Sequence, residues 1–253
     1  MKFAFRATLL IIICLLSLRG YAEERYRHEL FSKLLAKYVD GGLVDYEGFE
    51  RDSLFSRYLN LLRSTNPDSL ESRKEQLAFW INAYNAYTIK LIVDRMPLNS
   101  IRDIGLGLPV LFGPWSIEMA NVGGRVYTLN EIEHDIIRDR FSDPRIHFAL
   151  VCASRSCPEL RKEAYEGPVL EAQLEEDSRR FVNDITRNSF EPSTRTAFLS
   201  RIFDWYASDF EKKAGDVRKF VAAYVTGEEA RRLLQDPESD IDYLTYDWSL
   251  NGK

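Results

Sequence analysis

The chain has 253 residues, with 34 basic and 39 acidic side chains, and 13% of its residues are aromatic. This length is enough for one domain with a sizeable hydrophobic core, and no repeat or low-complexity linker divides the sequence. Acidic charge without a basic cluster argues against nucleic acid and anionic lipid as partners, so a small molecule or a peptide is the expected substrate.

Residues 1–22 have the pattern of a secretory signal peptide. Lys2 and Arg6 precede the apolar run ATLLIIICLLSL, and the small residues Gly20 and Ala22 follow. The run is short for a bilayer span, and the pattern predicts cleavage after Ala22. We expect a periplasmic or secreted protein that meets a membrane only through this export signal, with an uncleaved anchor as the alternative. Cleavage would leave 31 basic and 39 acidic residues, a net charge near −8.

The segment 23–69 predicts helices that pack on the rest of the chain. Apolar residues recur at helical spacing over 24–39, and a second helix is expected over 46–62. Residues 70–93 predict one long helix that is apolar on nearly every side, which is typical of a buried central helix. The glycines and prolines of residues 99–115 predict an irregular loop.

Residues 116–129 predict a hairpin around Asn-Val-Gly-Gly. Thr128 and Glu131 fit a capping box that starts a helix reaching about residue 140. The alternating sequence RIHFALVC, residues 145–152, predicts a strand. Cys157 directly precedes a proline, which suits the first position of a short helix.

The last part of the chain predicts a helix over 170–183, a hairpin over 189–199, helices that start near Ser200 and Asp216, and a short strand-like segment in YLTYDWSLN. Together these elements predict an α+β fold, a helix-rich single domain around a long buried central helix, with a small sheet and hairpins. Residues 70–251 would form the main domain.

Three polar side chains fall in apolar surroundings. Glu133 lies within the apolar stripe of its predicted helix and needs a partner, for which Arg145, His147 and Arg102 are candidates. It either forms a structural ion pair or orients a catalytic histidine. Asn82 and Asn85 are three residues apart on one face of the central helix, so they either pin a loop or line a polar pocket.

Removal of the signal peptide would leave two cysteines, Cys152 and Cys157. In the predicted strand Cys152 faces the core, whereas His147 points to the opposite face. Cys157, at a helix start between Arg155 and Arg161, is the candidate thiolate.

A thiolate nucleophile needs a histidine that shuttles protons, and the sequence holds three. His147 and His134 are the candidates, and His28 in the first helix is the least favoured. Glu133, Asn82 or Asn85 would orient the imidazole.

Other interpretations of the cysteines stay open. Cys152 and Cys157 could form a disulfide, either structural or redox-active. His147 and both cysteines could also ligate zinc, with His134 or a carboxylate as the fourth ligand. The strand alternation disfavours zinc, because it directs His147 away from Cys152. We therefore expect no metal and no cofactor.

Several of these stretches resemble one family in the same order along the chain: LAFWINAYNAYTIKLI, SIRDIG, the Gly-Gly hairpin, YTLNEIEHDIIR, DPRIHFALVCASRSCPELR and YLTYDWSLN. The sequence is similar over residues 70–251 to domain-of-unknown-function family 547. The resemblance implies that ten positions belong to the family pattern, but it assigns them no roles. They are Trp80, Asn82, Asn85, Glu133, His134, His147, Cys152, Ser156, Cys157 and Pro158.

The leading hypothesis from the sequence is an exported, thiol-dependent hydrolase or acyl/peptidyl transferase that acts on an amide or a thioester. Cys157 would attack the carbonyl, and His147 or His134 would serve as base and then as acid. The alternative is a non-catalytic periplasmic binding or scaffold protein with a structural or redox-active Cys152–Cys157 disulfide.

Overall fold

A computed structural model describes residues 28–105 and 113–253. The expected signal peptide and residues 106–112 of the expected irregular loop lie outside the described residues. In the described part of the chain no helix has the length and apolar character needed to cross a bilayer.

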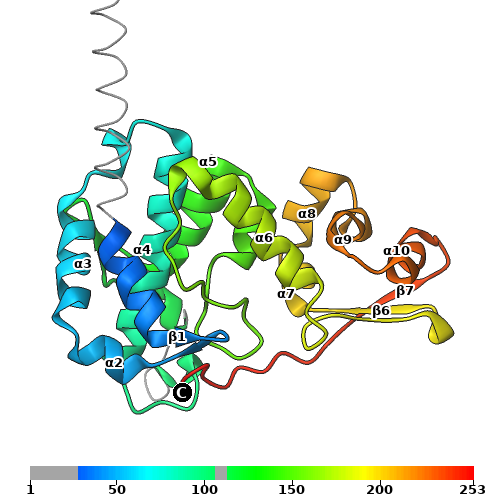
Figure 1. The fold of residues 1–253 in the computed structure, drawn as a ribbon, viewed down its shortest axis with the longest axis horizontal. Coiled ribbons are helices and arrows are strands. Elements are labelled where there is room, and N and C mark those ends of the chain that lie inside the picture. Colours follow the sequence, from blue (N-terminus) through cyan, green and yellow to red (C-terminus); the bar gives the residue numbers. More distant parts are fainter. Residues whose placement is uncertain (1–27, 106–112) are drawn as a thin grey trace, which may run out of the picture.

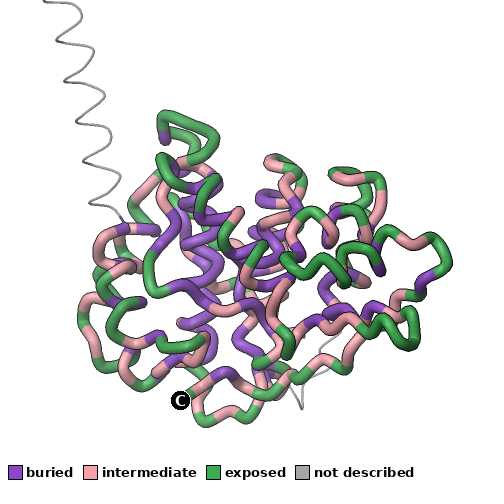
Figure 2. Tube along the Cα trace, turned by 45° about the vertical axis from the view of Figure 1, so that its right-hand side comes forward, coloured by how far each residue is buried: buried purple, intermediate pink, exposed green. Residues whose placement is uncertain are grey.

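The long central helix is α4, Arg73–Val93. Ser72 caps its N-terminus, and the reciprocal hydrogen bonds of Ser72 and Glu75 form a capping box. Between Leu77 and Ile92 nearly every side chain of α4 is buried (Figure 2), as the sequence predicts for a helix that is apolar all round. The remaining elements pack around it (Figure 1).

The N-terminal elements cover one side of α4. Residues 28–38 are helical, and β1 (Val39–Asp40), β2 (Leu43–Val44), α2 (Tyr46–Arg51) and α3 (Ser53–Ser64) follow. The single helix expected over 46–62 is two helices, because the side chain of Asp52 caps α3 through the amide of Leu54. Phe31, Phe49 and Tyr58 belong to the same core as α4.

The middle of the chain contains the predicted hairpin, β3 (Ala120–Val122) with β4 (Arg125–Tyr127), paired antiparallel. The predicted Thr128–Glu131 capping box is also present, with both reciprocal hydrogen bonds. The helix that it starts winds as a π-helix over Glu131–Arg138 (η4) and ends as α5, Asp139–Phe141. The π-helix is rare in proteins, and where it occurs it is frequently found at a functional site.

The C-terminal half builds a second, smaller core from aromatic and aliphatic side chains of α6, β6 and the last helices. Its helices and strands are α6 (Leu170–Val182), β5 (Ser189–Glu191), β6 (Thr196–Leu199), α7 (Arg201–Trp205), α8 (Ala207–Ala214), α9 (Val217–Tyr224), α10 (Glu228–Gln235) and β7 (Asp240–Tyr243). The sheet order is β5-β6-β7, with β6 antiparallel to β5 and parallel to β7. Helix α10 was not predicted.

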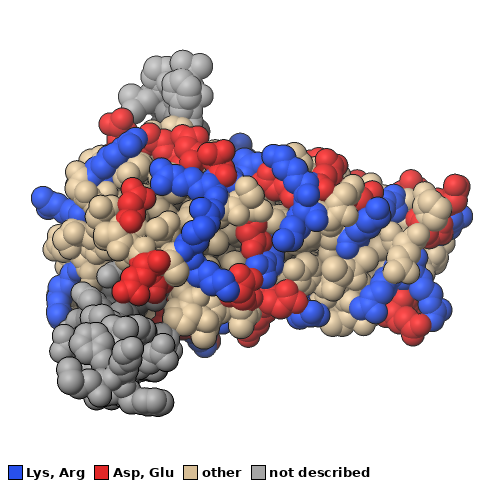
Figure 3. Space-filling view, turned by 90° about the horizontal axis from the view of Figure 1, so that it is seen from above, with Lys and Arg blue, Asp and Glu red and all other residues tan. Residues whose placement is uncertain are grey.

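After β7 the chain turns back along the lower edge of the molecule and ends beside β1 (Figure 1). We call residues 244–253 the C-terminal strap. Isolated bridges join the strap to Ser100, Ser154 and Val44. On the face shown in Figure 3, acidic and basic side chains are interspersed.

The α+β prediction is therefore confirmed, with a helix-rich fold and small sheets around α4. Two local predictions are wrong. Residues 145–152 form no strand, because Asp143 caps a 3₁₀ turn, η5 (Pro144–Phe148), and irregular backbone follows. Cys157 starts no helix, because its amide closes a turn on the carbonyl of Ser154 and residues 158–166 run without helical structure.

Candidate functional site

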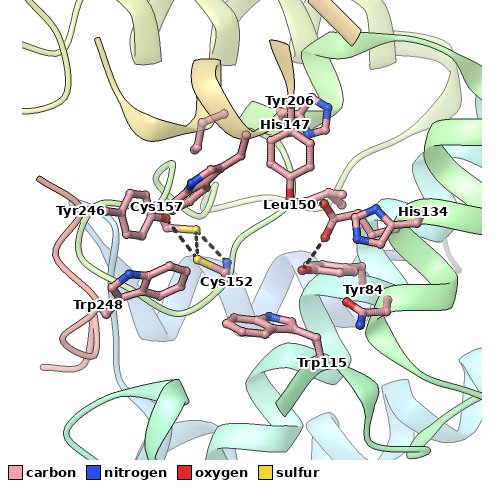
Figure 4. A pocket seen from close by; sticks show the side chains of 14 residues that line it. Tyr84, Trp115, His134, His147, Leu150, Cys152, Cys157, Tyr206, Tyr246 and Trp248 are labelled. Atoms are coloured by element: carbon pink, nitrogen blue, oxygen red, sulfur yellow. Dashed lines mark hydrogen bonds between the residues drawn. The ribbon is translucent and has the colours of Figure 1, made fainter. Parts of the chain in front are cut away.

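A pocket of about 170 Å³ lies where the two cores meet (Figure 4). Its lining comes from α4, η3 (Pro114–Ser116), η4 with the residue before it, η5 with the loop after it, α7 with the turn that follows it, and the C-terminal strap. The lining residues are Tyr84, Trp115, Asn130, Glu133, His134, His147, Leu150, Cys152, Cys157, Ile202, Trp205, Tyr206, Tyr246 and Trp248. The pocket thus brings together four of the six residues singled out from the sequence.

The other two residues, Asn82 and Asn85, hold loops in place. The Asn85 side chain donates to the carbonyl of Ala149 and accepts from the amide of Val151, at 2.9 Å each. Asn82 does the same for the carbonyl and amide of Tyr165, at 2.8 and 2.9 Å. Their amide groups are therefore committed to backbone, and the expectation that either one orients a histidine is wrong. Asn85 fixes the segment that leads into Cys152.

The two cysteine sulfurs lie side by side on one wall of the pocket (Figure 4). The Sγ atom of Cys157 donates to that of Cys152 across 2.7 Å, and the Cys152 amide donates to the Cys157 sulfur at 2.8 Å. Both cysteines are free thiols. Cys152 is half-buried, whereas only 3% of Cys157 is exposed. A left-handed turn at Ala153, with φ of 63°, bends the chain between them.

The environment separates the two thiols chemically. The hydrogen bond from Cys157 is the main cause that lowers the pKa of Cys152, to about 7, and Ser154 and Tyr246 act in the same direction against burial. Burial, followed by the neighbouring Cys152, raises the pKa of Cys157 well above that of an ordinary thiol. The exposure of Cys152 and the two pKa directions favour Cys152 as the thiolate of the pair, whereas the sequence favours Cys157 for that role.

The arginines expected beside Cys157 point elsewhere. Arg161 is bound to the buried Asp177 at 2.8 Å and to Glu176 at 2.7 Å. Among the described residues, neither Arg155 nor Arg161 forms a hydrogen bond or ion pair with a cysteine. The thiolate at Cys152 thus depends on neutral donors, which are Cys157, Ser154 and Tyr246.

A second wall of the pocket carries the histidines. His147 is buried, and its Nε2 lies 2.8 Å from Oδ2 of Asp209. Arg138 holds the same carboxylate through Nε and Nη2 and contacts Nδ1 of His134 at 3.0 Å. Burial lowers the pKa of His147 against the opposing effect of Asp209, so the neutral ring donates from Nε2.

Glu133 is bound by two tyrosines and by none of the partners that the sequence suggests. Its two carboxylate oxygens accept hydrogen bonds from the hydroxyls of Tyr84, at 3.0 Å, and Tyr206, at 2.6 Å. The predicted ion pairs with Arg145, His147 or Arg102 are therefore wrong; Arg145, for example, binds Asp143 and Glu171. Both oxygens act as acceptors. Burial is the main cause that raises the pKa of both tyrosines.

The strap closes the pocket with aromatic rings. Tyr246 places its hydroxyl 3.3 Å from the Cys152 sulfur and 3.1 Å from Oγ of Ser154. Trp248 stacks on Trp205 with ring centroids 5.6 Å apart, and Trp115 meets Trp248 edge-on at 5.8 Å. The strap is fixed by backbone hydrogen bonds, including those from the amides of residues 155 and 156 to the carbonyls of residues 249 and 247.

Sequence reasoning missed several of these residues. The segment YLTYDWSLN, which the sequence predicts as strand-like, contains Tyr246 and Trp248. The aromatic residues in this short stretch are the signal that points to them. Tyr84 stands beside the two asparagines of α4. Asp209 gave no signal, because its link to His147 joins residues 62 positions apart.

Cys157 forms no hydrogen bond with a histidine of the pocket, so the expected catalytic dyad is not seen as a hydrogen-bonded pair. Among the described residues no hydrogen bond joins either cysteine to His134 or His147. His147 and Cys152 were also expected on opposite faces of a strand, yet both line the pocket. In the described part of the chain no three histidine, cysteine or carboxylate side chains form a group that could hold a metal ion. His28 lies outside this pocket and bonds to the Tyr58 hydroxyl at 2.9 Å.

Fold and site together define a helix-rich α+β protein with a paired-cysteine pocket. Residues 67–182 match the family model described as "Protein of unknown function, DUF547". The chain is therefore a DUF547 domain-containing protein, as the motifs predict. No curated protein and no solved structure matches the chain. The matched segment contains both cysteines, Glu133 and the two pocket histidines, whereas Tyr206, Asp209 and the strap lie outside it.

Proposed function

We propose that this protein carries out thiol–disulfide exchange, with Cys152 as the attacking thiolate and Cys157 as the resolving thiol. One observation carries the proposal: the two sulfurs lie 2.7 Å apart, one half-exposed with a lowered pKa and the other buried with a raised pKa. An accessible thiolate beside a buried thiol is the asymmetry that two-step exchange requires.

In the first step the Cys152 thiolate attacks one sulfur of a substrate disulfide. The substrate S–S bond breaks, a mixed disulfide forms at Cys152, and the released thiolate takes up a proton. Cys157 then loses its proton and attacks the Cys152 sulfur, which releases the second substrate thiolate and forms the Cys152–Cys157 disulfide. The two protein thiols are oxidised, the substrate disulfide is reduced to two thiols, and the two protons pass to these products.

The test uses a neutral small disulfide, 2-hydroxyethyl disulfide, with acid quenching and intact-mass measurement. Reduced wild-type protein should lose two hydrogens without retaining an adduct. Cys157→Ser should accumulate one mercaptoethanol adduct at Cys152, because the resolving thiol is missing. If Cys152 reacts no faster than a free model thiol of the same pKa, the proposed function is wrong.

A thiol-dependent hydrolase or acyl/peptidyl transferase is the second candidate. It is favoured by the presence of His134 and His147 in the same pocket as Cys152. The Cys152 thiolate would attack the carbonyl of a thioester or amide, a histidine would protonate the leaving group, and water or an acceptor would release the acyl group. An activated ester separates the candidates: acylation of Cys152 that turns over in Cys157→Ala supports the transferase, because exchange requires both thiols.

We place this chemistry in the periplasm or outside the cell, on the strength of the export-signal pattern in residues 1–22. A cleaved N-terminus beginning at residue 23 in protein recovered from the periplasm or medium would support this location. Retention in the cytoplasm with an intact N-terminus would contradict it.

A further inference from the structure

The wall of the pocket away from the cysteines has the composition of a cation site. Glu133 lines the pocket with 7% of its surface exposed, and both of its oxygens are held by tyrosine hydroxyls. Among the described lining residues Glu133 is the sole carboxylate, and no lysine or arginine is present. The carboxylate is therefore available to a cationic group that enters the pocket.

The aromatic lining favours the same charge. Ring faces attract cations, and tryptophan does so most strongly. Two lining rings already have a guanidinium over one face: Arg102 lies 5.3 Å from the ring centroid of Trp248, and Arg138 lies 5.1 Å from that of Tyr206. Arg138 is neutralised by its bidentate bond to Asp209, and neither arginine lines the pocket.

The size of the pocket limits the ligand. A volume of about 170 Å³ is close to that of cavities of about 150 Å³ that hold a benzene ring. One small organic group therefore fits between the cysteine pair and Glu133. Figure 4 places the cysteines and Tyr84, whose hydroxyl binds Glu133, on different sides of the pocket. A ligand that reaches both walls carries its sulfur and its cationic group only a few bonds apart.

We infer that the preferred substrates are disulfides of small amines, bound with the ammonium at Glu133 and the reacting sulfur at Cys152. This inference rests on the proposed thiol–disulfide exchange and names its substrate class. Glu133 acts here as a specificity-determining residue, and the aromatic rings add to the selection of positive charge.

The test compares three disulfides of similar length and different charge: cystamine, 2-hydroxyethyl disulfide and 3,3′-dithiodipropionate. Each rate of oxidation of the reduced full-length protein is divided by the rate with the thiolate of 2-mercaptoethanol, which corrects for intrinsic reactivity. We expect the corrected order cystamine, then neutral, then dianion. In Glu133→Gln the cystamine-to-neutral ratio should fall about fivefold, the effect of one partly screened ion pair. Glu191→Gln, an exposed position on β5, should keep the wild-type ratio.

The outcomes separate the two proposals. Equal corrected rates, or a preference for the dianion, overturn the amine specificity while leaving the exchange activity in place. If no disulfide oxidises the protein faster than it reacts with the thiolate of 2-mercaptoethanol, both the exchange activity and the amine specificity are overturned. The wild-type series alone decides the inference if the Glu133 variant does not fold.

Discussion

Replacement of Cys157 by alanine should change the reactivity of Cys152 in opposite directions at low and high pH. The Cys157 hydrogen bond is the largest cause of the lowered pKa of Cys152. If the pKa rose from about 7 to the 9.0 of an unperturbed thiol, the thiolate fraction at pH 7 would fall roughly 50-fold. A more basic thiolate is also more nucleophilic, by about 8-fold over two pKa units. The net loss at pH 7 is then at most about 6-fold.

Above about pH 8 the order should reverse, because the roughly 8-fold greater nucleophilicity of Cys152 in Cys157→Ala then outweighs its smaller thiolate fraction. The assay is the rate of alkylation by iodoacetamide from pH 5 to 11, followed at Cys152 by peptide mass. Cys152→Ala is the matched control, in which Cys157 should react slowly throughout because burial raises its pKa. Wild-type and Cys157→Ala profiles with the same midpoint would refute the reasoning.

Four further substitutions test the architecture of the site. Asn85→Ala should lower the free energy of unfolding by about 2–5 kcal/mol, because two buried backbone groups lose their partners, and it should slow the alkylation of Cys152. Asn82→Ala should lower the free energy of unfolding by a similar amount and leave the alkylation rate unchanged. Chemical denaturation and alkylation kinetics measure the two effects. Tyr246→Phe should raise the Cys152 pKa by removing a donor, and an unchanged alkylation midpoint would speak against that role. A hydrogen bond from the buried histidine, with Arg138, holds the pKa of Asp209 well below its usual range. Its contribution to stability is therefore present above about pH 4 and lost below it, so melting temperature should fall more steeply between pH 5 and 3 in wild type than in Asp209→Asn.

The elements that the sequence predicted are those with local causes. Helix α4 is apolar on all sides and begins at a capping box. Its burial and its first residue can therefore be predicted from residues that are close together in the sequence. The β3–β4 hairpin and the Thr128–Glu131 capping box are likewise short-range. These predictions needed no knowledge of the partner elements.

The prediction of a strand over 145–152 is wrong because the residue types alternate while the burial does not. Ile146 to Val151 are all buried, and a short apolar run of this kind does not by itself distinguish a strand from other buried backbone. The backbone of Ala149 and Val151 is instead satisfied by the side chain of Asn85, 64 and 66 residues away. That same error directed His147 away from Cys152 and assigned Cys152 to the core.

The composition of the site was only partly predictable. Both cysteines, both pocket histidines and Glu133 were found from residue type and position. The tyrosine partners of Glu133 and the carboxylate at His147 depend on contacts between residues 49 to 73 positions apart. Such contacts follow from the packing of α4 against η4 and of α8 against η5, which the local pattern does not encode.

The central claim is that Cys152 and Cys157 form a reversible redox pair, and a redox titration tests it most directly. The protein is equilibrated in buffers of increasing ratio of oxidised to reduced glutathione, quenched with acid and alkylated, and the bridged fraction is measured by mass. We predict one reversible two-electron transition within the accessible range of ratios. Two alkylatable thiols at the most oxidising ratio, or a bridge that persists at the most reducing one, would contradict the account.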